Sequence, residues 1–528
     1  MDNRKEYPIG IQSFQEIITN NLLYVDKTEF VYRLVKKNKY YFLIRPRRFG
    51  KSLLISTLEA YFLGKRELFK GLAIDSHEDL EWKEYPVFHL DFNAQNYSDS
   101  DDSLAQVLEK NLRKWEEKYG VTFNKDSFSL RFERIIEAAY HKTGLQAVIL
   151  IDEYDRPLLQ NLSKERMERQ EKFRNILKGF FGVLKSSDEF IKFGFLTGVT
   201  KFGRVSVFSD LNNLSDITLL RDYNALCGIT ETELLENFQI GITELSDQYG
   251  LSYEGTCARL KRSYDGYKFT GWKAEGIYNP FSLLSAFNNR EFDEYRFLTA
   301  TPTMLIELLK DCDLSLFQLD GSTRSGSELM GLEPILKDPI PLLFQTGYLT
   351  IKRMEEEDEE KIYTLGFPNK EVERGFLRSL LPNYVSMNRI DGNFKISRFV
   401  KALRECRVDD FMNLLKGLIA GIPYGEKGKR VHENRFRDVM FIICRLIGLS
   451  VDSEIHTVQG RIDMTVKTDR FIYIMEFKVD ESSDKALEQI DRMHYADPYI
   501  ADGRTVVKVG VRFSSKVRNI DDWKPVMV

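Results

Sequence analysis

The sequence predicts an α/β protein with three main parts: a doubly wound parallel sheet at the amino-terminal end, a helical middle, and a smaller α/β domain at the carboxyl-terminal end. Up to about residue 230, short aliphatic runs alternate with long stretches of helical spacing, as in a parallel sheet covered by helices. The aliphatic runs then become sparse. After residue 449 they return, separated by turn residues.

Length and composition are those of a globular protein with several domains. The chain has 528 residues, of which 43% are hydrophobic and 30% are charged, so about three or four domains of ordinary size are expected. A formal net charge of −4 excludes a basic protein that coats nucleic acid with its whole surface, although it allows a local basic site.

The expected compartment is the cytoplasm. The cysteines lie far apart and form no C-x-x-C pair, which fits a reducing environment. The first residues are not followed by an apolar stretch, and the sequence contains no run of about 18 apolar residues. We therefore expect no association with a membrane.

Strands and helices alternate regularly in the first part, residues 1–230. Strands are expected at 40–44, 87–92, 147–151 and 191–197, and helices at 53–62, 103–118 and 128–141. This order predicts a parallel, doubly wound sheet.

A phosphate-binding loop is expected where the first strand meets the first of these helices. Residues 45–52 read R-P-R-R-F-G-K-S, which matches G-x-x-x-x-G-K-[ST] except that Arg45 occupies the first glycine position. Gly50 lets the backbone approach the phosphates of ATP. Lys51 would reach the β- and γ-phosphates, and the Ser52 hydroxyl would ligate Mg²⁺. The amides at the start of the helix add an anion site.

A second motif, of the Walker B type, supports this loop. The strand 147–151 ends in Asp152-Glu153, where Asp152 would hold the magnesium ion through water and Glu153 would polarise the attacking water. The alternative is an acidic pair that caps a core strand. Thr197 ends the next strand, at the position of a γ-phosphate sensor, or it is an ordinary threonine before a turn.

Several motifs of the first 300 residues resemble the AAA-ATPase-like family of bacterial proteins. They are Tyr7-Pro8-Ile9-Gly10, Tyr24-Val25-Asp26-Lys27-Thr28, the R-P-R-R-F-G-K-S loop, Tyr264-Asp265-Gly266-Tyr267 and Tyr278-Asn279-Pro280. The resemblance implies a P-loop NTPase domain that binds ATP. It also implies that Arg45 is the usual residue of this loop and no sign of an inactive site.

The middle part, residues 231–385, is expected to be mostly helical. Amphipathic helices are expected at 230–248 and 293–310. The acidic run 355–360 lies between two strand-like segments, 348–351 and 362–365, so we expect an exposed loop that joins two strands.

The last two parts are a helical linker, residues 386–429, and a carboxyl-terminal domain, residues 430–528. The linker is expected to contain a helix at 396–419. In the domain, the expected order is a helix at 432–446, strands at 449–456, 461–466 and 471–479, a helix at 484–499 and a strand at 505–513.

Charged residues in the predicted strand 471–479 indicate a site. Glu476 and Lys478 share one face of the strand with two isoleucines. If 467–470 makes a tight turn, Asp463 lies opposite Ile474 and diagonal to Glu476, within reach of a shared ion. Two carboxylates around Mg²⁺ and a lysine beside the attacking water form a phosphodiesterase arrangement. The alternative is a surface hairpin with ion pairs.

This domain also resembles the PD-(D/E)XK nuclease superfamily. The residues that carry the resemblance are Glu433, Asp463, Glu476, Phe477, Lys478, Gln489 and Tyr495. The resemblance implies a restriction-endonuclease-like α/β fold, in which Glu433 completes the metal shell or orients a ligand. Gln489 and Tyr495 would brace the site or contact the nucleic-acid backbone. Ile462 stands where many members have proline, and inactive members exist.

A group of basic residues at the start of this domain would contact phosphates, or it forms an ordinary solvated face. The group consists of Lys427, Lys429, Arg430, Arg435 and Arg437.

Three hypotheses follow from the sequence. The first is an ATP-binding protein, expected to hydrolyse ATP, with a Mg²⁺-dependent nuclease-like tail whose access to DNA or RNA depends on the nucleotide state. The second is an ATP-driven regulatory protein whose tail binds without cleaving. The third is a phosphotransferase. The sequence specifies neither the type of nucleic acid nor the oligomeric state.

Overall fold

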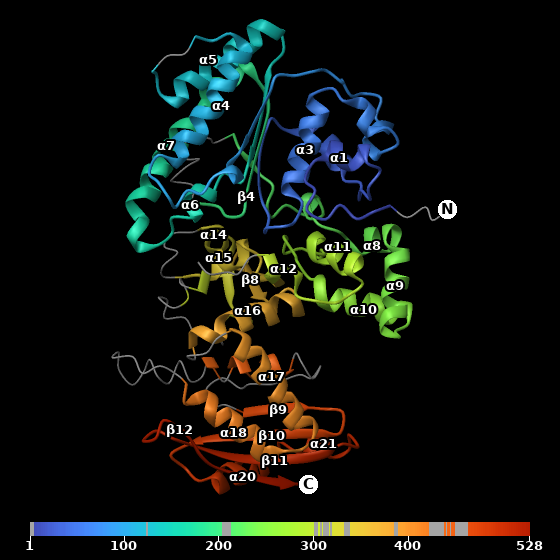
Figure 1. Ribbon diagram of the computed structural model, residues 1–528, viewed down its shortest axis with the longest axis vertical. Helices are drawn as coiled ribbons and strands as arrows, with labels where there is room; N and C mark the ends of the chain where they lie inside the picture. The colour runs from blue at the N-terminus through green and yellow to red at the C-terminus, as the bar shows by residue number, and fades with distance from the viewer. Residues whose placement is uncertain are drawn as a thin grey trace. The chain divides into compact units, whose positions relative to one another are not determined.

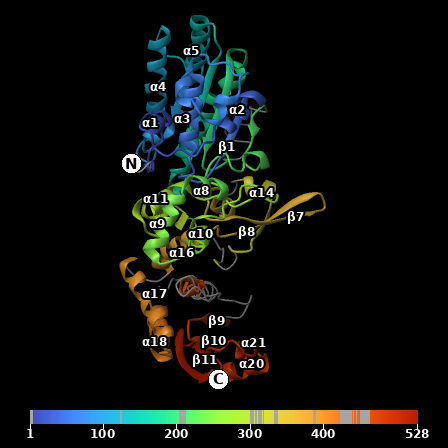
Figure 2. The same cartoon turned by 90° about the vertical axis from the view of Figure 1, so that its right-hand side faces the viewer.

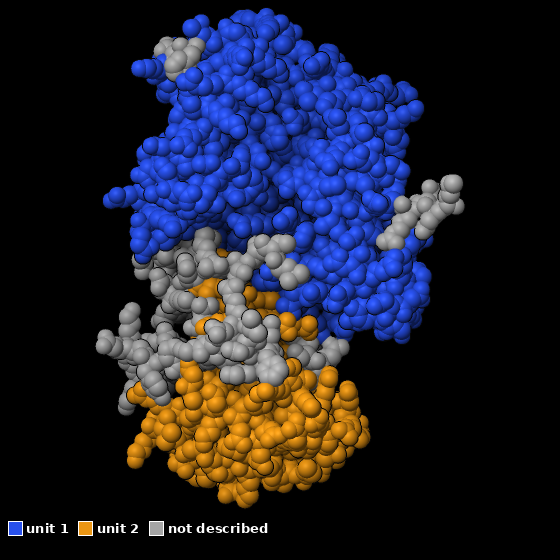
Figure 3. Space-filling view, viewed as in Figure 1, with its two compact units in different colours: residues 1–299, 320–371 blue, residues 300–319, 372–528 orange. Residues whose placement is uncertain are grey.

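The structure is a computed structural model that describes residues 5–122, 125–202, 213–299, 305–306, 309, 316, 319–331, 338–384, 389–421, 438–439, 441–443, 445–448 and 463–528. The chain divides into two compact units (Figure 3). The first comprises residues 1–299 and 320–371, and the second comprises residues 300–319 and 372–528. The division into four parts at 230, 385 and 429 stays a prediction.

A parallel five-stranded sheet forms the centre of the first unit, in the order β2-β3-β4-β1-β5. The strands are β1 (Tyr40–Ile44), β2 (Val87–Asp91), β3 (Ala147–Asp152), β4 (Ile191–Gly198) and β5 (Ser215–Asp216). The doubly wound parallel sheet and its four predicted strands are therefore confirmed. The fifth strand has only two residues, too few for a hydrophobic pattern.

Helices cover both faces of this sheet (Figure 1). Helices α4, α5 and α7 lie on one face, and α1 and α3 lie on the other. Their bounds, with those of α2 and α6, are α1 (Phe14–Thr19), α2 (Thr28–Lys37), α3 (Lys51–Phe62), α4 (Ser103–Tyr119), α5 (Phe128–Thr143), α6 (Arg156–Leu159) and α7 (Met167–Ser186). Every residue of β3 is buried, as expected for a central parallel strand.

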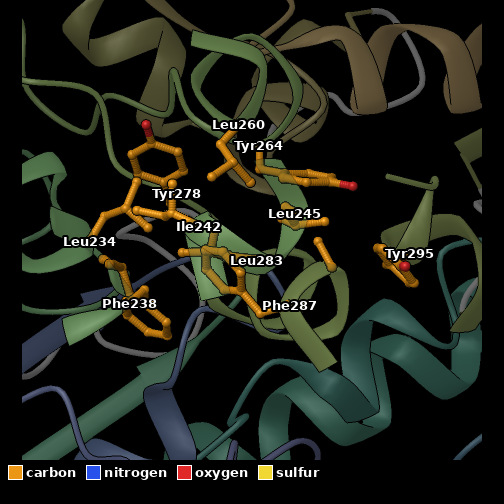
Figure 4. Packing of buried hydrophobic residues seen from close by; sticks show 12 residues of the cluster. Leu234, Phe238, Ile242, Leu245, Leu260, Tyr264, Tyr278, Leu283, Phe287 and Tyr295 are labelled. Atoms are coloured by element: carbon orange, nitrogen blue, oxygen red, sulfur yellow. The ribbon is translucent and has the colours of Figure 1, made fainter. Parts of the chain in front are cut away.

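A helical lobe with its own hydrophobic core follows the sheet in the first unit (Figure 4). Its helices are α8 (Glu231–Asn237), α9 (Gln239–Tyr249), α10 (Tyr253–Tyr264), α11 (Pro280–Asn289) and α12 (Tyr295–Thr299). Leu234, Phe238 and Phe287 belong to the buried cluster that joins them. The helix predicted at 230–248 is two helices, because the backbone of Phe238 leaves the helical region between α8 and α9.

The acidic run forms the end of a β-hairpin arm, so the loop predicted at 355–360 is wrong in extent. Strands β7 (Thr350–Glu357) and β8 (Glu360–Gly366) continue through the acidic residues, and only Asp358 and Glu359 form the turn. Both turn residues have positive φ, the conformation of a type I′ hairpin turn. Strand β6 (Thr323–Ser325) pairs with β8, and the arm projects in Figure 2. Helices α14 (Gly326–Met330) and α15 (Ile340–Gln345) lie between β6 and β7 in sequence.

A mixed four-stranded sheet in the order β12-β11-β10-β9 forms the core of the second unit. The strands are β9 (Asp463–Lys467), β10 (Phe471–Val479), β11 (Thr505–Ser514) and β12 (Asn519–Met527). The helix predicted at 484–499 is divided into α20 (Ser483–Arg492) and α21 (Asp497–Ile500). Helix α20 connects the parallel strands β10 and β11 and packs against both.

Helices that precede this sheet in sequence include α16 (Lys370–Tyr384), α17 (Arg389–Arg404) and α18 (Val408–Ile419). The predicted helix 396–419 is interrupted between α17 and α18, where Cys406 has φ +55°. The predicted strand 449–456 and parts of the predicted helices 293–310 and 432–446 lie outside the described residues. Among the described helices, none combines the length and apolar character needed to span a bilayer.

Candidate nucleotide and metal sites

The phosphate loop connects β1 to α3 at the carboxyl edge of the parallel sheet. Gly50 has φ +89°, which favours glycine, and no side chain caps α3, which begins at Lys51. Among the described residues, the first-turn amides therefore have no side-chain acceptor, and they suit a phosphate. Lys51 is buried, and its ammonium donates to the carbonyl oxygens of Arg45 at 3.1 Å and Pro46 at 3.2 Å. Ser52 lies half-buried in the same turn.

Arg45 supports the loop from the protein interior. Its guanidinium donates to the carbonyl oxygens of Ile44, Thr218 and Tyr223, each at 2.9 Å, and it lies 4.1 Å from the centre of the Phe269 ring. Burial lowers the pKa of Arg45 to about 10. The residue that departs from the glycine pattern is thus a buried structural cation.

Asp152 and Thr197 are in direct contact where β3 and β4 end. Thr197 is fully buried, and its hydroxyl donates to Asp152 Oδ1 at 2.6 Å. β4 also pairs with β1, so that Ile44 stands beside Gly198, and the phosphate loop leaves the sheet at the same edge. The structure therefore brings both predicted motifs to one edge. A contact between Thr197 and a γ-phosphate stays a prediction.

Glu153 occupies a strained position directly after β3. Its φ is +51°, a region that costs a non-glycine residue roughly 1–2 kcal/mol, and its carboxylate lies 3.3 Å from Arg156 Nη1. The same Arg156 nitrogen donates to the side chain of Asn93.

A third carboxylate, Asp91, ends β2 directly opposite Asp152 in the strand register. Burial raises the pKa of Asp91, and the negative charges of Asp152 and Glu153 raise it further. Carboxylates that repel one another at one edge of a sheet suit a bound Mg²⁺ ion. Asp91 was not predicted as a site residue, although it lies near the end of the predicted strand 87–92.

A further carboxylate, Asp155, was also not predicted as a site residue. It is fully buried and accepts hydrogen bonds from the backbone amides of Val199 and Thr200 and from the Thr200 hydroxyl. Burial raises the pKa of Asp155 to about 6. The only signal in the sequence is a second acid in the same turn, D-E-Y-D.

The tip of the phosphate loop packs against later parts of the first unit. Phe49 makes edge contacts with Tyr267 at 4.8 Å and Phe269 at 5.4 Å between ring centres, and Arg48 lies 4.9 Å from the centre of the Phe281 ring. The motif Tyr264-Asp265-Gly266-Tyr267 therefore supplies part of the loop's support.

The register of the carboxyl-terminal hairpin differs from the predicted one. Asp463 is directly opposite Glu476, and Ile474 faces Thr465. The tip of the turn lies at Asp469 and Arg470, one residue later than expected, because Thr468 already pairs with Phe471. A shift of one residue at the tip moves the register by two. In the strand register, Asp463 and Glu476 thus form a direct cross-strand pair.

Glu476 is a buried carboxylate with incomplete hydrogen bonding. It is 1% exposed, and in the part of the chain that the structure describes neither oxygen meets a hydrogen-bond donor. Lys478 Nζ lies 3.2 Å from Glu476 Oε1, close enough for an ion pair but not aligned as a hydrogen bond. Lys478 also donates to Gln489 Oε1 on α20. A buried carboxylate with free lone pairs is costly and fits a cation.

The remaining predicted residues are placed as follows. Tyr495 packs at the edge of a small core formed by β10, β11 and α20. Glu433 and the five basic residues of 427–437 lie outside the described residues. In the part of the chain that the structure describes, no group of three or more His, Cys, Asp or Glu side chains converges as a complete metal site.

Comparisons with known proteins match two separate parts of the chain. The family described as "Predicted AAA-ATPase" matches residues 8–208, and the "PD-(D/E)XK nuclease superfamily" matches residues 431–523. A protein of Azotobacter chroococcum mcd 1, named "Uncharacterized protein in vnfD 5'region", is 35% identical over 532 residues, which cover 98% of each chain. No solved structure matches the chain. The chain therefore belongs to the AAA-ATPase-like family and carries a PD-(D/E)XK nuclease superfamily domain at its carboxyl-terminal end.

Proposed function

We propose that this protein binds and hydrolyses ATP at the phosphate loop, and that the nucleotide state controls a Mg²⁺-dependent phosphodiesterase centre around Glu476 that acts on nucleic acid. The observation that carries the proposal is the buried, incompletely bonded carboxylate of Glu476 beside Lys478. It occurs in a chain whose phosphate loop and Asp152 share one sheet edge.

In the ATP half, the chain's own groups have distinct tasks. The amides of the first turn of α3 would bind the phosphates, and Lys51 would exchange its loop carbonyls for phosphate oxygens. Ser52 and Asp152 would hold Mg²⁺, which when bound neutralises the phosphate charge. Glu153 would orient the attacking water, and Thr197 would keep the Asp152 carboxylate in place.

In the nuclease half, Glu476 and Asp463 would hold the metal ion, with Glu433 as a further ligand. The ion, when bound, polarises the phosphodiester and lowers the pKa of water. Lys478 would stabilise the charge that develops on the phosphate. Gln489 would orient the Lys478 ammonium through the hydrogen bond that it already accepts.

Binding of ATP is tested by titrating the full-length protein with a fluorescent ATP analogue in Mg²⁺. Lys51→Ala should weaken binding at least about tenfold, because hydrogen bonds to charged groups contribute roughly 1.5–3 kcal/mol. Lys36→Ala is the control, since Lys36 is an exposed residue of the same unit paired with Asp79. Equal binding by wild type and Lys51→Ala would contradict the assignment of the loop.

Cleavage is tested with labelled DNA and RNA in Mg²⁺ or Mn²⁺. Glu476→Gln should lower the rate by about 10²–10³-fold, as expected when a group that stabilises the transition state is removed. Glu481→Gln, an exposed neighbour paired with Lys485, should cleave as wild type does. If wild type binds ATP and nucleic acid but cleaves neither substrate, the protein is a regulatory protein with a binding tail.

A further inference from the structure

The turn after β3 is tied to the end of β4 by a buried carboxylate. Asp155 Oδ2 accepts from the amide of Val199 at 3.0 Å, from the amide of Thr200 at 2.6 Å and from the Thr200 hydroxyl at 2.6 Å. The Tyr154 hydroxyl, beside it, donates to the carbonyl oxygen of Thr200 at 2.9 Å. Gly198 allows this close approach, because a Cβ there would lie 2.7 Å from Asp155 Oδ1.

These contacts connect Asp155 to Asp152, the proposed magnesium ligand, through the end of β4. Thr197, which donates to Asp152 Oδ1, is two residues before Val199 in the segment that Asp155 holds. The carbonyl oxygen of Thr197 also accepts from the amide of Tyr154 at 3.0 Å. The turn and the strand end are therefore joined at several points, and the orientation of Asp152 depends on that junction.

We propose that Asp155 is a positioning residue of the ATP site: by holding the end of β4, it keeps Thr197 on Asp152 and fixes the turn that presents Glu153. The inference rests on the proposed ATP hydrolysis. Asp155 is not a catalytic residue, because its carboxylate is fully buried and is used by groups of the chain itself.

Burial of the Asp155 carboxylate costs free energy, which supports a role beyond capping the turn after β3. Among the described residues, no cation pairs with the Asp155 carboxylate. A fully buried carboxylate of this kind is an expensive acceptor for a turn, and the cost appears as the raised pKa of Asp155. Glu153 adds like charge. The charged and titratable groups around the turn are Glu153, Tyr154, Arg156 in α6, and the Lys201–Asp216 ion pair at the exits of β4 and β5.

The test is ATP hydrolysis by the full-length protein as a function of pH, with kcat and KM determined separately. Asp155→Ala should lower kcat about 10–100-fold, the usual effect of losing a residue that orients a ligand, with little change in KM. Asp155→Asn mimics the protonated carboxyl, so its kcat should be reduced throughout, whereas the kcat of wild type should fall as the pH drops through about 6. Thr200→Val should lower kcat by removing one donor from the same carboxylate.

A matched control separates positioning from stability. Asp26 accepts the same kinds of donor, the Thr28 amide and hydroxyl and the Ala73 amide, in the same unit. Asp26→Asn should lower the melting temperature while kcat and its pH profile stay as in wild type. If Asp155→Asn and Thr200→Val behave in that way too, Asp155 has only a structural role and the inference is wrong. A wild type that hydrolyses no ATP would instead contradict the proposed function itself.

Discussion

At the phosphate loop, Arg45 occupies the position of a glycine and yet makes three hydrogen bonds to buried carbonyl groups. The motif G-x-x-x-x-G-K-[ST] treats Arg45 as a mismatch. In the structure, the buried Arg45 side chain instead fills the space below the phosphate loop. We predict that Arg45→Gly, which restores the pattern, lowers the free energy of unfolding by at least about 3 kcal/mol. Three carbonyls would lose their donors and a cavity would open.

Urea unfolding of wild type and the Arg45→Gly variant measures this effect. Arg47→Ala is the control at an exposed position of the same loop. A variant of Arg45 that is as stable as wild type and binds ATP more tightly would show that the arginine is dispensable.

Motifs in the sequence indicate candidate site residues better than they indicate the contacts that those residues make. Lys51 and Asp152 could be proposed from motifs, since the chemistry expected of them requires these residue types at these spacings. Asp155 could not, because a second acid in a turn is common and the groups that donate hydrogen bonds to it come from residues about 45 positions later. The partner of Asp463 was missed by two residues, because a hairpin register depends on which residues form the tip.

At the scale of the elements, α20 is held close to β11 by Gly510. A Cβ at this position would collide with the carbonyl oxygen of Ser483, so no other residue allows the same approach. We predict that Gly510→Ala destabilises the second unit by about 1–3 kcal/mol, the usual cost of overpacking. It should also slow nucleic-acid cleavage, because α20 carries Gln489, the partner of Lys478.

The control for this prediction is Gly417→Ala in α18, where a Cβ meets nothing within 4 Å and alanine favours the helix. Thermal unfolding and cleavage are measured for both variants, and ATP hydrolysis should be unchanged in each. Equal stability of Gly510→Ala and wild type would mean that α20 can move away from the sheet without cost.

The existence of the elements was easier to predict than their ends. Long periodic stretches such as those of α4 and α5 were found, because a buried helix face needs a regular hydrophobic pattern. The interruptions at Cys406 and His494 were missed, since both are non-glycine residues with positive φ. The acidic run was expected to be a loop because of its charge, but strand pairing continues through it up to Asp358.

For the molecule as a whole, folding of the first unit should depend on pH through Glu371. This residue is buried, one oxygen accepts from the Ser282 hydroxyl and the Arg296 amide, and burial raises its pKa to about 7. The native state thus keeps a proton that the unfolded chain releases at a lower pH. The stabilisation is fully present below about pH 4.5 and is lost as the pH rises through about 7.

Glu371→Gln keeps an acceptor for both donors and cannot ionise. We predict that its free energy of unfolding changes less than that of wild type between pH 4.5 and pH 7 and exceeds it above pH 7. Chemical denaturation at several pH values measures the difference. An identical pH dependence in both proteins would show that Glu371 does not ionise in this range.

The proposed function requires that the nucleotide site governs chemistry at the Glu476 centre. The most direct test is the rate of cleavage of labelled DNA and RNA by full-length wild type and Lys51→Ala, each with and without ATP. We predict that ATP changes the wild-type rate by about fivefold or more, within the usual range of coupling between sites, and leaves the Lys51→Ala rate unchanged. A wild type that cleaves equally well with and without ATP would contradict the proposed control of cleavage by the nucleotide site.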